Sequence, residues 1–426
     1  MTSRTDRTSL DLQEAGTDAV PPLAWRGTSG LQASSATMRI RFHEMDFLRA
    51  AAMLQGIFFH AALSFTALDS AWFVRDRSHH WAVDFLAWTS HTFRMPIFFV
   101  MAGFFAHLLY HRYGLAGFVR QRVQRIGIPF VAGVLLLIPL SQALGLFGRA
   151  KIDGKSSPSE IWGLLYQHFT SRTFLTNMNT GHLWFLYYLL LLYTAAITLT
   201  VAGRWLLHES GLDRLDRYFS WSAKSHLAPL VLSVPTVLLY LILRRRIISV
   251  PVSFTPDLLV FAYYGLFFSF GWLLHRQPAL LQDYGRRTFH NLGAAALVLM
   301  ISPWYLRKAF ERDDPYYVWW ALCTLSMTAL FTWLMVFGLI GFSVRYFSRP
   351  SARVRYVSDS AYWLYLMHLP LVVFLQILLA DSPLPGILKY LLIVLISMTL
   401  LLLSYHYFVR YTFIGATLNG KRERRG

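Results

Sequence analysis

Cysteine is almost absent from this chain of 426 residues, which contains only Cys323. An intrachain disulfide and a cysteine-rich metal site are therefore excluded. Charge is also scarce, since 15% of the residues are Asp, Glu, Lys or Arg, whereas an average soluble domain has about 25%. The sequence also lacks a Walker loop, an HExxH motif and a nucleotide-binding glycine fingerprint. We therefore expect no bound metal and no bound cofactor.

Acidic residues are few relative to basic ones, with 22 Asp and Glu against 40 Lys and Arg and a formal net charge of +18. Such an excess is typical of proteins that bind nucleic acid and of membrane proteins whose cytoplasmic loops are basic. The basic residues here mostly flank long apolar runs. We therefore expect membrane lipid, and no nucleic acid, as a partner.

Long apolar runs dominate the sequence, which is 55% hydrophobic. They have the length of helices that cross lipid and lack the alternation of membrane barrel strands. We predict an all-α polytopic membrane protein with about ten transmembrane helices in one bundle. The predicted spans are Phe47–Leu68, Val83–Tyr110, Ile126–Phe147, His182–Gly203, Leu227–Leu243, Pro256–Leu274, Leu292–Leu306, Tyr317–Phe342, Ser360–Ala380 and Ile387–Val409.

Polar segments surround this membrane domain, which we place at residues 45–410. Residues 1–44 contain no apolar signal-peptide core, and their composition predicts a disordered tail. Residues 411–426 form a second, basic tail. An even number of spans puts both termini on one side. With the termini in the cytoplasm, 25 Lys and Arg lie inside and 13 outside, so basic residues predict cytoplasmic termini. The longest outer loop, 148–181, is predicted to be irregular.

Ionisable side chains within a span are costly and tend to be functional. The first span contains Asp46, Arg49 and His60. Arg49 and His60 are eleven residues apart, which places them on one helix face about 16 Å apart along the axis. Asp46, three residues before Arg49, can pair with it. The alternative is that Asp46 and Arg49 anchor the helix at the interface and that His60 only packs, although snorkelling explains Arg49 better than His60.

The second span carries His91 and Arg94, and Arg94 lies too deep to reach the interface easily. We interpret Arg94 as functional, with snorkelling as the alternative. Arg122 and Arg125 precede the third span. They are either ordinary cytoplasmic flanking residues or a cradle for phosphates, for which arginine is well suited.

Two further groups of residues stand near the predicted outer surface. His182 and Trp184 open the fourth span, where interfacial aromatic residues are common and a structural role is the alternative. Tyr362, Tyr365 and His368 are spaced by three and lie near one face of the ninth span. For His368 the alternative is a packed histidine with a satisfied hydrogen bond.

Taken together, these motifs resemble the acyltransferase-3 family of integral membrane acyltransferases over about residues 43–410. Asp46-Phe-Leu-Arg49 and the spacing from Arg49 to His60 resemble the first-helix motif of the family. Further resemblances are Phe98-Phe-Val-Met-Ala-Gly-Phe104, Arg122-Val-Gln-Arg125-Ile-Gly-Ile-Pro129 and Ser360-Ala-Tyr362-Trp-Leu-Tyr365-Leu-Met-His368. Within the family, the segments that begin at His91, Arg125 and His182 are most similar to the branch that succinylates periplasmic glucans.

The resemblance implies an O-acyltransferase of the bacterial inner membrane. It would move an acyl group, succinyl in this branch, from a cytoplasmic acyl-CoA donor to hydroxyls of a periplasmic glucan or another extracytoplasmic sugar. Acyl-CoA would be a co-substrate, and glucan-synthesis proteins would be partners. The implied site has catalytic and donor-binding residues, supported by others. The catalytic residues are His60, Arg49 and Asp46; the donor-binding residues are Arg94, Arg122 and Arg125; the supporting residues are His91, His182, Trp184, Tyr362, Tyr365 and His368.

Two other classes of protein fit the same polar residues. In a transporter or flippase for a glucan, a lipid-linked sugar or a small organic anion, these residues would line the path of the substrate. In a sensor without enzymatic activity they would bind a ligand. Acyl transfer by the purified protein separates the enzyme from both.

Overall fold

The structure is a computed structural model that describes residues 42–67, 72–152, 154, 157–176, 178–206, 209–244, 248, 250–311 and 313–420. The predicted N-terminal tail up to residue 41 lies outside these residues, as do residues 421–426. Within the described ranges the chain is helical and has no strand. The helices are α1 (His43–Ala62), α2 (Trp81–Arg122), α3 (Ile128–Ile152), α4 (Pro158–Thr170), α5 (Arg172–Thr176), α6 (Trp184–Leu206), α7 (Glu209–Lys224), α8 (Ala228–Leu243), α9 (Leu258–Arg276), α10 (Leu280–Arg286), α11 (Thr288–Phe310), α12 (Tyr317–Phe347), α13 (Ala352–Leu379), α14 (Gly386–Ser404) and α15 (Phe413–Asn419).

A helix lies at the position of each predicted span, and the all-helical membrane fold is confirmed. By length and apolar composition, eight segments of the described chain can cross a membrane, or nine if the bent pair α7–α8 is one span. The longest segment, Trp81–Lys151, has 71 residues, which at 1.5 Å per residue is far longer than the ~30 Å hydrocarbon core. It leaves helical geometry at Gly114, where φ is 65°, a value that glycine adopts easily. The segment therefore holds two of the predicted spans, α2 and α3.

Side-chain contacts give the relative directions of neighbouring helices. Arg49 meets Ser358 and, further along both helices, His60 meets His368, so α1 and α13 run in the same direction. Likewise Phe99 stacks on Tyr264 while His107 meets His275, so α2 and α9 run in the same direction. Helices that run in the same direction through a membrane are separated by an odd number of crossings. The ten predicted spans satisfy this rule, since α3, α6 and α8 lie between α2 and α9.

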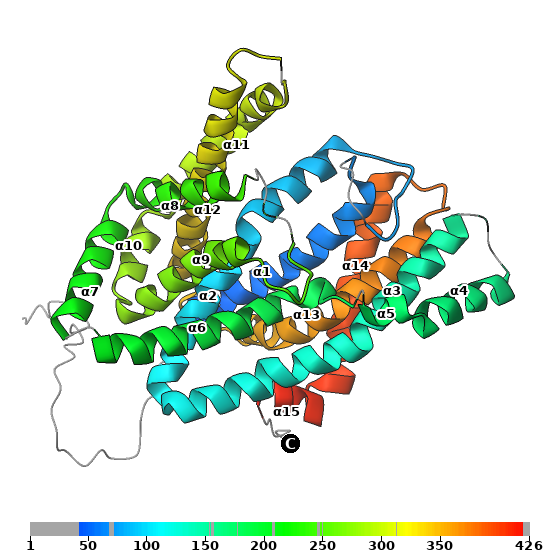
Figure 1. The fold of residues 1–426 in the computed structure, drawn as a ribbon, viewed down its shortest axis with the longest axis horizontal. Coiled ribbons are helices and arrows are strands. Elements are labelled where there is room, and N and C mark those ends of the chain that lie inside the picture. The colour runs from blue at the N-terminus through cyan, green and yellow to red at the C-terminus, as the bar shows by residue number, and fades with distance from the viewer. Residues whose placement is uncertain are drawn as a thin grey trace, which may run out of the picture. The chain divides into compact units, whose positions relative to one another are not determined.

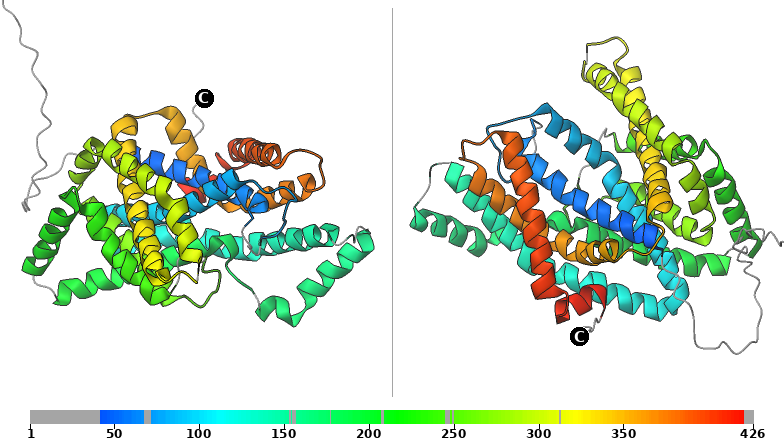
Figure 2. Two further views of the ribbon diagram at one scale, coloured as in Figure 1. Left: turned by 90° about the horizontal axis from the view of Figure 1, so that it is seen from above. Right: turned by 180° about the vertical axis from the view of Figure 1, so that it is seen from behind.

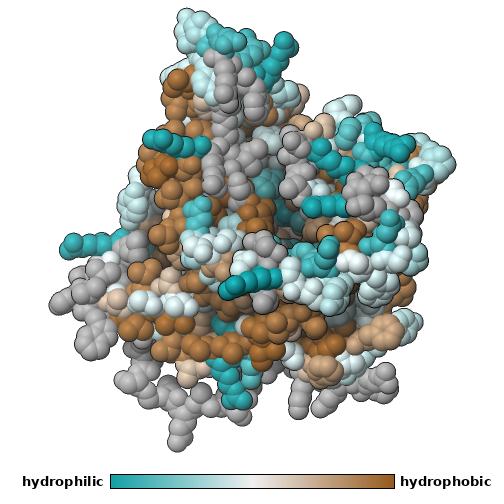
Figure 3. Space-filling model, turned by 45° about the vertical axis from the view of Figure 1, so that its right-hand side comes forward, coloured by the Kyte–Doolittle hydropathy of each residue, from teal (hydrophilic) through white to brown (hydrophobic). Residues whose placement is uncertain are grey.

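The outer surface of the helix bundle is apolar. Large side chains such as Leu136, Leu199, Leu297 and Met300 are mostly exposed on helices that qualify as spans. Figure 3 shows apolar side chains over much of one face. Such a surface is favourable in lipid and unfavourable in water. The chain is therefore a multi-pass membrane protein.

Helix α1 lies in the middle of the bundle, where it packs against α2, α12, α13 and α14 (Figures 1 and 2). Helices α2 and α9 meet at two glycines. A Cβ at Gly103 would lie 1.9 Å from the carbonyl oxygen of Phe268, and one at Gly271 would lie 1.8 Å from that of Val100. Only glycine permits this backbone contact, which is a common device of membrane helix pairs. The contact fixes α2, and with it the ionisable residues of α2, against the centre.

Several segments outside the predicted spans contain helix, among them α7 and α10. The outer loop 148–181 holds α4 and α5, so the prediction of an irregular loop was wrong. Its missed signal is Ser157-Pro158-Ser-Glu160, a capping box with proline at the helix start. Residues 111–125 continue α2 into a π-helical turn, Val123–Gly127. The predicted C-terminal tail begins with α15, which packs against α13.

Candidate active site

Two intramembrane histidines from distant parts of the chain lie side by side. The ring centroids of His60 on α1 and His368 on α13 are 5.0 Å apart. His182, just before α6, joins them, with its ring centroid 5.8 Å from that of His368. We call these three residues the histidine cluster. His182 and His368 are buried, with 8% and 4% of their surface exposed, so the cluster lies inside the bundle.

Backbone carbonyl groups orient two rings of the histidine cluster. Nδ1 of His368 lies 2.6 Å from the carbonyl oxygen of Tyr365, and Nε2 of His182 lies 3.1 Å from that of Leu366. A carbonyl only accepts, so each of these nitrogens donates. In the neutral ring the opposite nitrogen then has a free lone pair. Nε2 of His368, Nδ1 of His182 and Nδ1 of His60 are buried without a hydrogen-bond partner in the described chain. The cluster therefore offers unoccupied basic nitrogens.

Trp72 and Gln376 surround His60, and sequence reasoning missed both. The Trp72 ring stacks on His60, with centroids 5.5 Å apart and planes at 19°. Its Nε1 donates to Oε1 of Gln376 at 2.9 Å. The amide nitrogen of Gln376 donates to the carbonyl oxygens of His60 and Ala61 at 3.1 and 3.2 Å. Carbonyls in the last turn of a helix lack intrahelical partners, so Gln376 both caps α1 and holds Trp72 against the histidine.

The segment that carries Trp72 is anchored by a buried ion pair. Asp76 and Lys389 of α14 lie 2.8 Å apart, and their side chains are 3% and 4% exposed. The Lys389 amine also donates to the carbonyl oxygen of Ala380 at 3.1 Å. Phe73 and Val74 pack against Gly145 and Gly148 of α3, where an added Cβ would meet them at 2.6 and 2.9 Å. The segment is therefore held firmly over the histidine cluster.

Arg94 of α2 is the arginine next to the histidine cluster. Its guanidinium lies over the ring of Phe59, 4.2 Å from the centroid, and only 7% of the residue is exposed. It interacts electrostatically with His60, His91 and His368. Phe59 also stacks on His91, and Nε2 of His91 lies 3.1 Å from the carbonyl oxygen of Ile248. The structure thus brings Arg94 and His91 to the predicted base, His60.

Three other arginines gather elsewhere on the same helices. Arg49 donates to Asp46 at 3.2 Å and to Ser358 at 2.8 Å. Arg125, in the π-helical turn, interacts electrostatically with Arg122 and Arg49. We call Arg49, Arg122 and Arg125 the arginine cluster. Asp46 is the carboxylate paired with it in the described chain, so the cluster has a positive excess that suits phosphate groups.

Tyrosines line the space between the two clusters. Arg122 donates to the hydroxyl of Tyr193 at 3.3 Å and lies over its ring. The Tyr362 hydroxyl, near Arg122, is buried without a partner among the described residues. Tyr365 stacks on Tyr362 and donates to the carbonyl oxygen of His182 at 2.8 Å. The predicted face of α13 therefore connects the clusters. Trp184, by contrast, is enclosed by Phe99, Tyr188 and Tyr264, which is a packing role.

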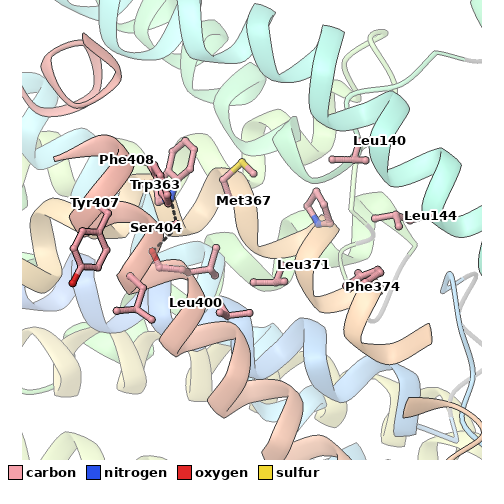
Figure 4. A pocket seen from close by; sticks show the side chains of 13 residues that line it. Leu140, Leu144, Trp363, Met367, Leu371, Phe374, Leu400, Ser404, Tyr407 and Phe408 are labelled. Atoms are coloured by element: carbon pink, nitrogen blue, oxygen red, sulfur yellow. Dashed lines mark hydrogen bonds between the residues drawn. The ribbon is translucent and has the colours of Figure 1, made fainter. Parts of the chain in front are cut away.

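An apolar groove, shown in Figure 4, is lined by no residue of either cluster. It has a volume of about 580 Å³ and lies between α3, α13 and α14. Its walls are apolar apart from Ser404, Tyr407 and Trp363, and Trp363 donates to Ser404 at 2.9 Å. The groove contains no ionisable group other than Tyr407, so acid–base chemistry belongs to the buried clusters. In the part of the chain that the structure describes, no group of three or more His, Cys, Asp or Glu is placed to hold a metal ion.

A membrane helix bundle that encloses three histidines and an arginine, with a second group of arginines near the start of α1, has the groups needed for acid–base chemistry inside the membrane. The chain matches the acyltransferase domain family over residues 42–406, and it belongs to this family. It is an acyltransferase, which sets aside the transporter and sensor interpretations.

Relatives of known name extend this match. Glucans biosynthesis protein C of Salmonella typhimurium strain LT2 is 26% identical over 390 residues, which cover 89% of this chain and 95% of the relative. Glucans biosynthesis protein C of Escherichia coli strain K12 is 30% identical over 347 residues, which cover 78% of this chain and 83% of the relative. No solved structure matches the chain.

Proposed function

We propose that the protein transfers a succinyl group from cytoplasmic acyl-CoA to hydroxyls of a periplasmic glucan. The acyltransferase family supports the reaction class, and the names of the relatives support the glucan acceptor. The observation that carries the proposal is the separation of the arginine cluster from the histidine cluster along α1 and α13. One end suits a phosphate-bearing donor, and the other suits proton transfer.

The proposed orientation places the arginine cluster on the cytoplasmic side of the inner membrane. The 25 to 13 bias of Lys and Arg favours cytoplasmic termini. Arg49 lies near the start of α1, so it faces the cytoplasm in this orientation, whereas His60 lies toward the periplasm. Reporter fusions after Asn419 are expected to behave as cytoplasmic and fusions at Gly154 as periplasmic. The reverse pattern would contradict the proposed donor side.

The distance between the clusters fits an extended donor. Arg49 and His60 are eleven residues apart on α1, about 16 Å along the axis. Arg122 and Arg125 would bind the phosphates of the donor, with Arg49 held beside them by Asp46 and Ser358. The thioester arm would then run past Tyr362 and Tyr365 to the histidines. In this way the acyl group reaches the periplasmic half while the nucleotide part stays on the cytoplasmic side.

His60 is the proposed general base. In direct transfer it takes the proton of the sugar hydroxyl as the hydroxyl oxygen attacks the thioester carbon. The ester bond forms, the carbon–sulfur bond breaks, and the departing thiolate receives the proton. A transient acyl-histidine, formed and then attacked by the sugar, is a second route that uses the same residues. His368, His182 and His91 would orient and support the base.

Mass spectrometry of periplasmic glucans from cells with and without the gene tests this function. The proposal expects succinylated glucan only in cells that carry the gene, and it expects glucan-synthesis proteins to supply the acceptor. Unmodified glucan in both strains would contradict the glucan acceptor. Acyl transfer by the purified protein to another sugar would then support the acyltransferase activity and assign it a different acceptor.

A further inference from the structure

Arg94 is a buried cation without a counter-ion. Its Nε has no hydrogen-bond partner, and no described residue forms a hydrogen bond or an ion pair with its guanidinium. The neighbours that interact with its charge are the aromatic residues Tyr264 and Tyr365 and the histidines around His60. Burying an unpaired ion is unfavourable by several kcal/mol. A charged group in this state inside a membrane bundle indicates a missing anionic ligand.

The packing around Arg94 has room for its charged end. A Cβ at Gly56 of α1 would lie 3.3 Å from Nη1 of Arg94, so the absence of a side chain at Gly56 lets the guanidinium approach α1. The face of Phe59 supports the guanidinium at 4.2 Å, and such cation–π contacts orient the group without neutralising it. The guanidinium is therefore held in place with its charge still available.

The position of Arg94 decides which anion it meets. Its support, Phe59, is the residue next to His60 in α1. The arginine cluster, in contrast, gathers around Arg49, about 16 Å along the same helix from His60. A donor whose phosphates occupy the arginine cluster presents its acyl end, and not its phosphates, to Arg94.

We propose that Arg94 binds a carboxylate at the far end of the transferred acyl group, and so selects dicarboxylic acyl donors over neutral ones. This inference rests on the proposed function, because it assumes that the acyl group is delivered to His60. The guanidinium binds a carboxylate through paired hydrogen bonds, which gives both affinity and direction. A neutral acyl chain of the same length leaves Arg94 buried and unpaired, so its transfer is disfavoured.

The test compares succinyl-CoA with butyryl-CoA, which has the same chain length and no carboxylate. Purified full-length protein would transfer each acyl group to glucan isolated from cells that lack the gene. We expect wild type to favour succinyl-CoA by roughly 10- to 100-fold in kcat/KM, as for a hydrogen bond to a charged group. Arg94→Gln is expected to remove most of this ratio, and Arg94→Lys, which keeps the charge, to retain part of it.

Arg122→Gln is the matched control, since Arg122 belongs to the arginine cluster. It is expected to lower kcat/KM for both donors equally and to leave their ratio unchanged. An Arg94→Gln variant that also lowers both equally would overturn the inference and place Arg94 among the phosphate-binding residues. If Arg94→Gln does not accumulate in the membrane, the test rests on the succinyl-CoA to butyryl-CoA ratio of wild type and of Arg94→Lys. A wild type without preference for succinyl-CoA contradicts the inference. Failure of wild type with every acyl donor would instead contradict the proposed function.

Discussion

The arginine cluster and the histidine cluster lie at opposite ends of the contact between α1 and α13, and they differ in how their polar groups are paired. Arg49 pairs with Asp46 and Ser358, and its side chain is 38% exposed. Around His368, which is 4% exposed, ring nitrogens and the Arg94 guanidinium lack partners. Paired charges near an interface can bind and release a polyanion, whereas unpaired buried groups are often those that take part in a reaction. The difference indicates a binding end and a reacting end.

The reacting end is most sensitive at His60. His60→Ala removes the proposed base while making α1 more apolar, so insertion is expected to be normal. Acyl transfer is expected to fall about 10²- to 10⁴-fold, the usual contribution of a positioned base. His368→Ala is the matched substitution on α13 and is expected to reduce transfer less, since its role is to orient. Steady-state transfer at equal membrane abundance measures both.

Activity of His60→Ala within about threefold of wild type would remove His60 as the base, because such a loss is far below the usual contribution. The role would then pass to His368, whose Nε2 is unoccupied and whose ring is fixed by the Tyr365 carbonyl.

The scaffold of the reacting end is tested at the ion pair of Lys389 and Asp76. Lys389→Met leaves Asp76 charged and buried, which typically costs about 3–5 kcal/mol. A large fall in the thermal midpoint in detergent is expected. Lys389→Met combined with Asp76→Leu removes both charges and is expected to recover much of the loss. Equal instability of the single and double variants would show that lost packing, and not the unpaired charge, is responsible.

The binding end is tested by replacing Arg122 and Arg125 together with Gln. We expect the KM for acyl-CoA to rise about tenfold or more, as expected when a charge-assisted contact to phosphate is lost, while kcat changes little. This pattern is typical of a contact made equally in the bound donor and the transition state. A lower protein level with unchanged kinetics would instead indicate that the two arginines only set membrane topology.

The smallest effect is expected at an exposed ion pair on the same side as the histidine cluster. Lys151 lies 2.9 Å from Asp381, whose side chain is 67% exposed. The hydrogen bond from Lys151 lowers the pKa of Asp381. The ion pair therefore stabilises the fold above the ordinary Asp pKa of about 3.9. This stabilisation is lost as the pH falls through the lower pKa that Asp381 has in the folded protein. Asp381→Asn is expected to change the thermal midpoint barely at pH 7 and not at all at low pH. A fall in the thermal midpoint as large as that of Lys389→Met would contradict the exposed position of Asp381.

Local patterns predicted those features that one helix determines by itself. Apolar runs located the spans, and the spacing from Arg49 to His60 placed both on one face because the helical period is constant. Contacts between distant segments were not predictable. Nothing local marks Trp72 as the partner of His60, because their relation depends on Gln376, more than 300 residues later. Lys389 was counted among the outer basic residues at the start of the last span, and its pairing with Asp76 depends on how α14 packs.

Amphipathic and surface helices were missed for a different reason. Helices α4 and α15 contain too few apolar residues to be identified as spans, so hydropathy alone classed them as loop or tail. The capping box at Ser157 was the available local signal for α4. The break at Gly114 was likewise hidden, because a single glycine in a helical segment has several meanings.

Transfer across a sealed membrane tests the division into a binding end and a reacting end most directly. The protein would be reconstituted in vesicles with its orientation established by protease accessibility of the C-terminus. Labelled succinyl-CoA would be supplied on the side of the arginine cluster and glucan on the side of the histidine cluster. The account predicts labelled glucan in this arrangement and none when donor and acceptor are both on the histidine side. Equal labelling when both are on the histidine side would contradict it.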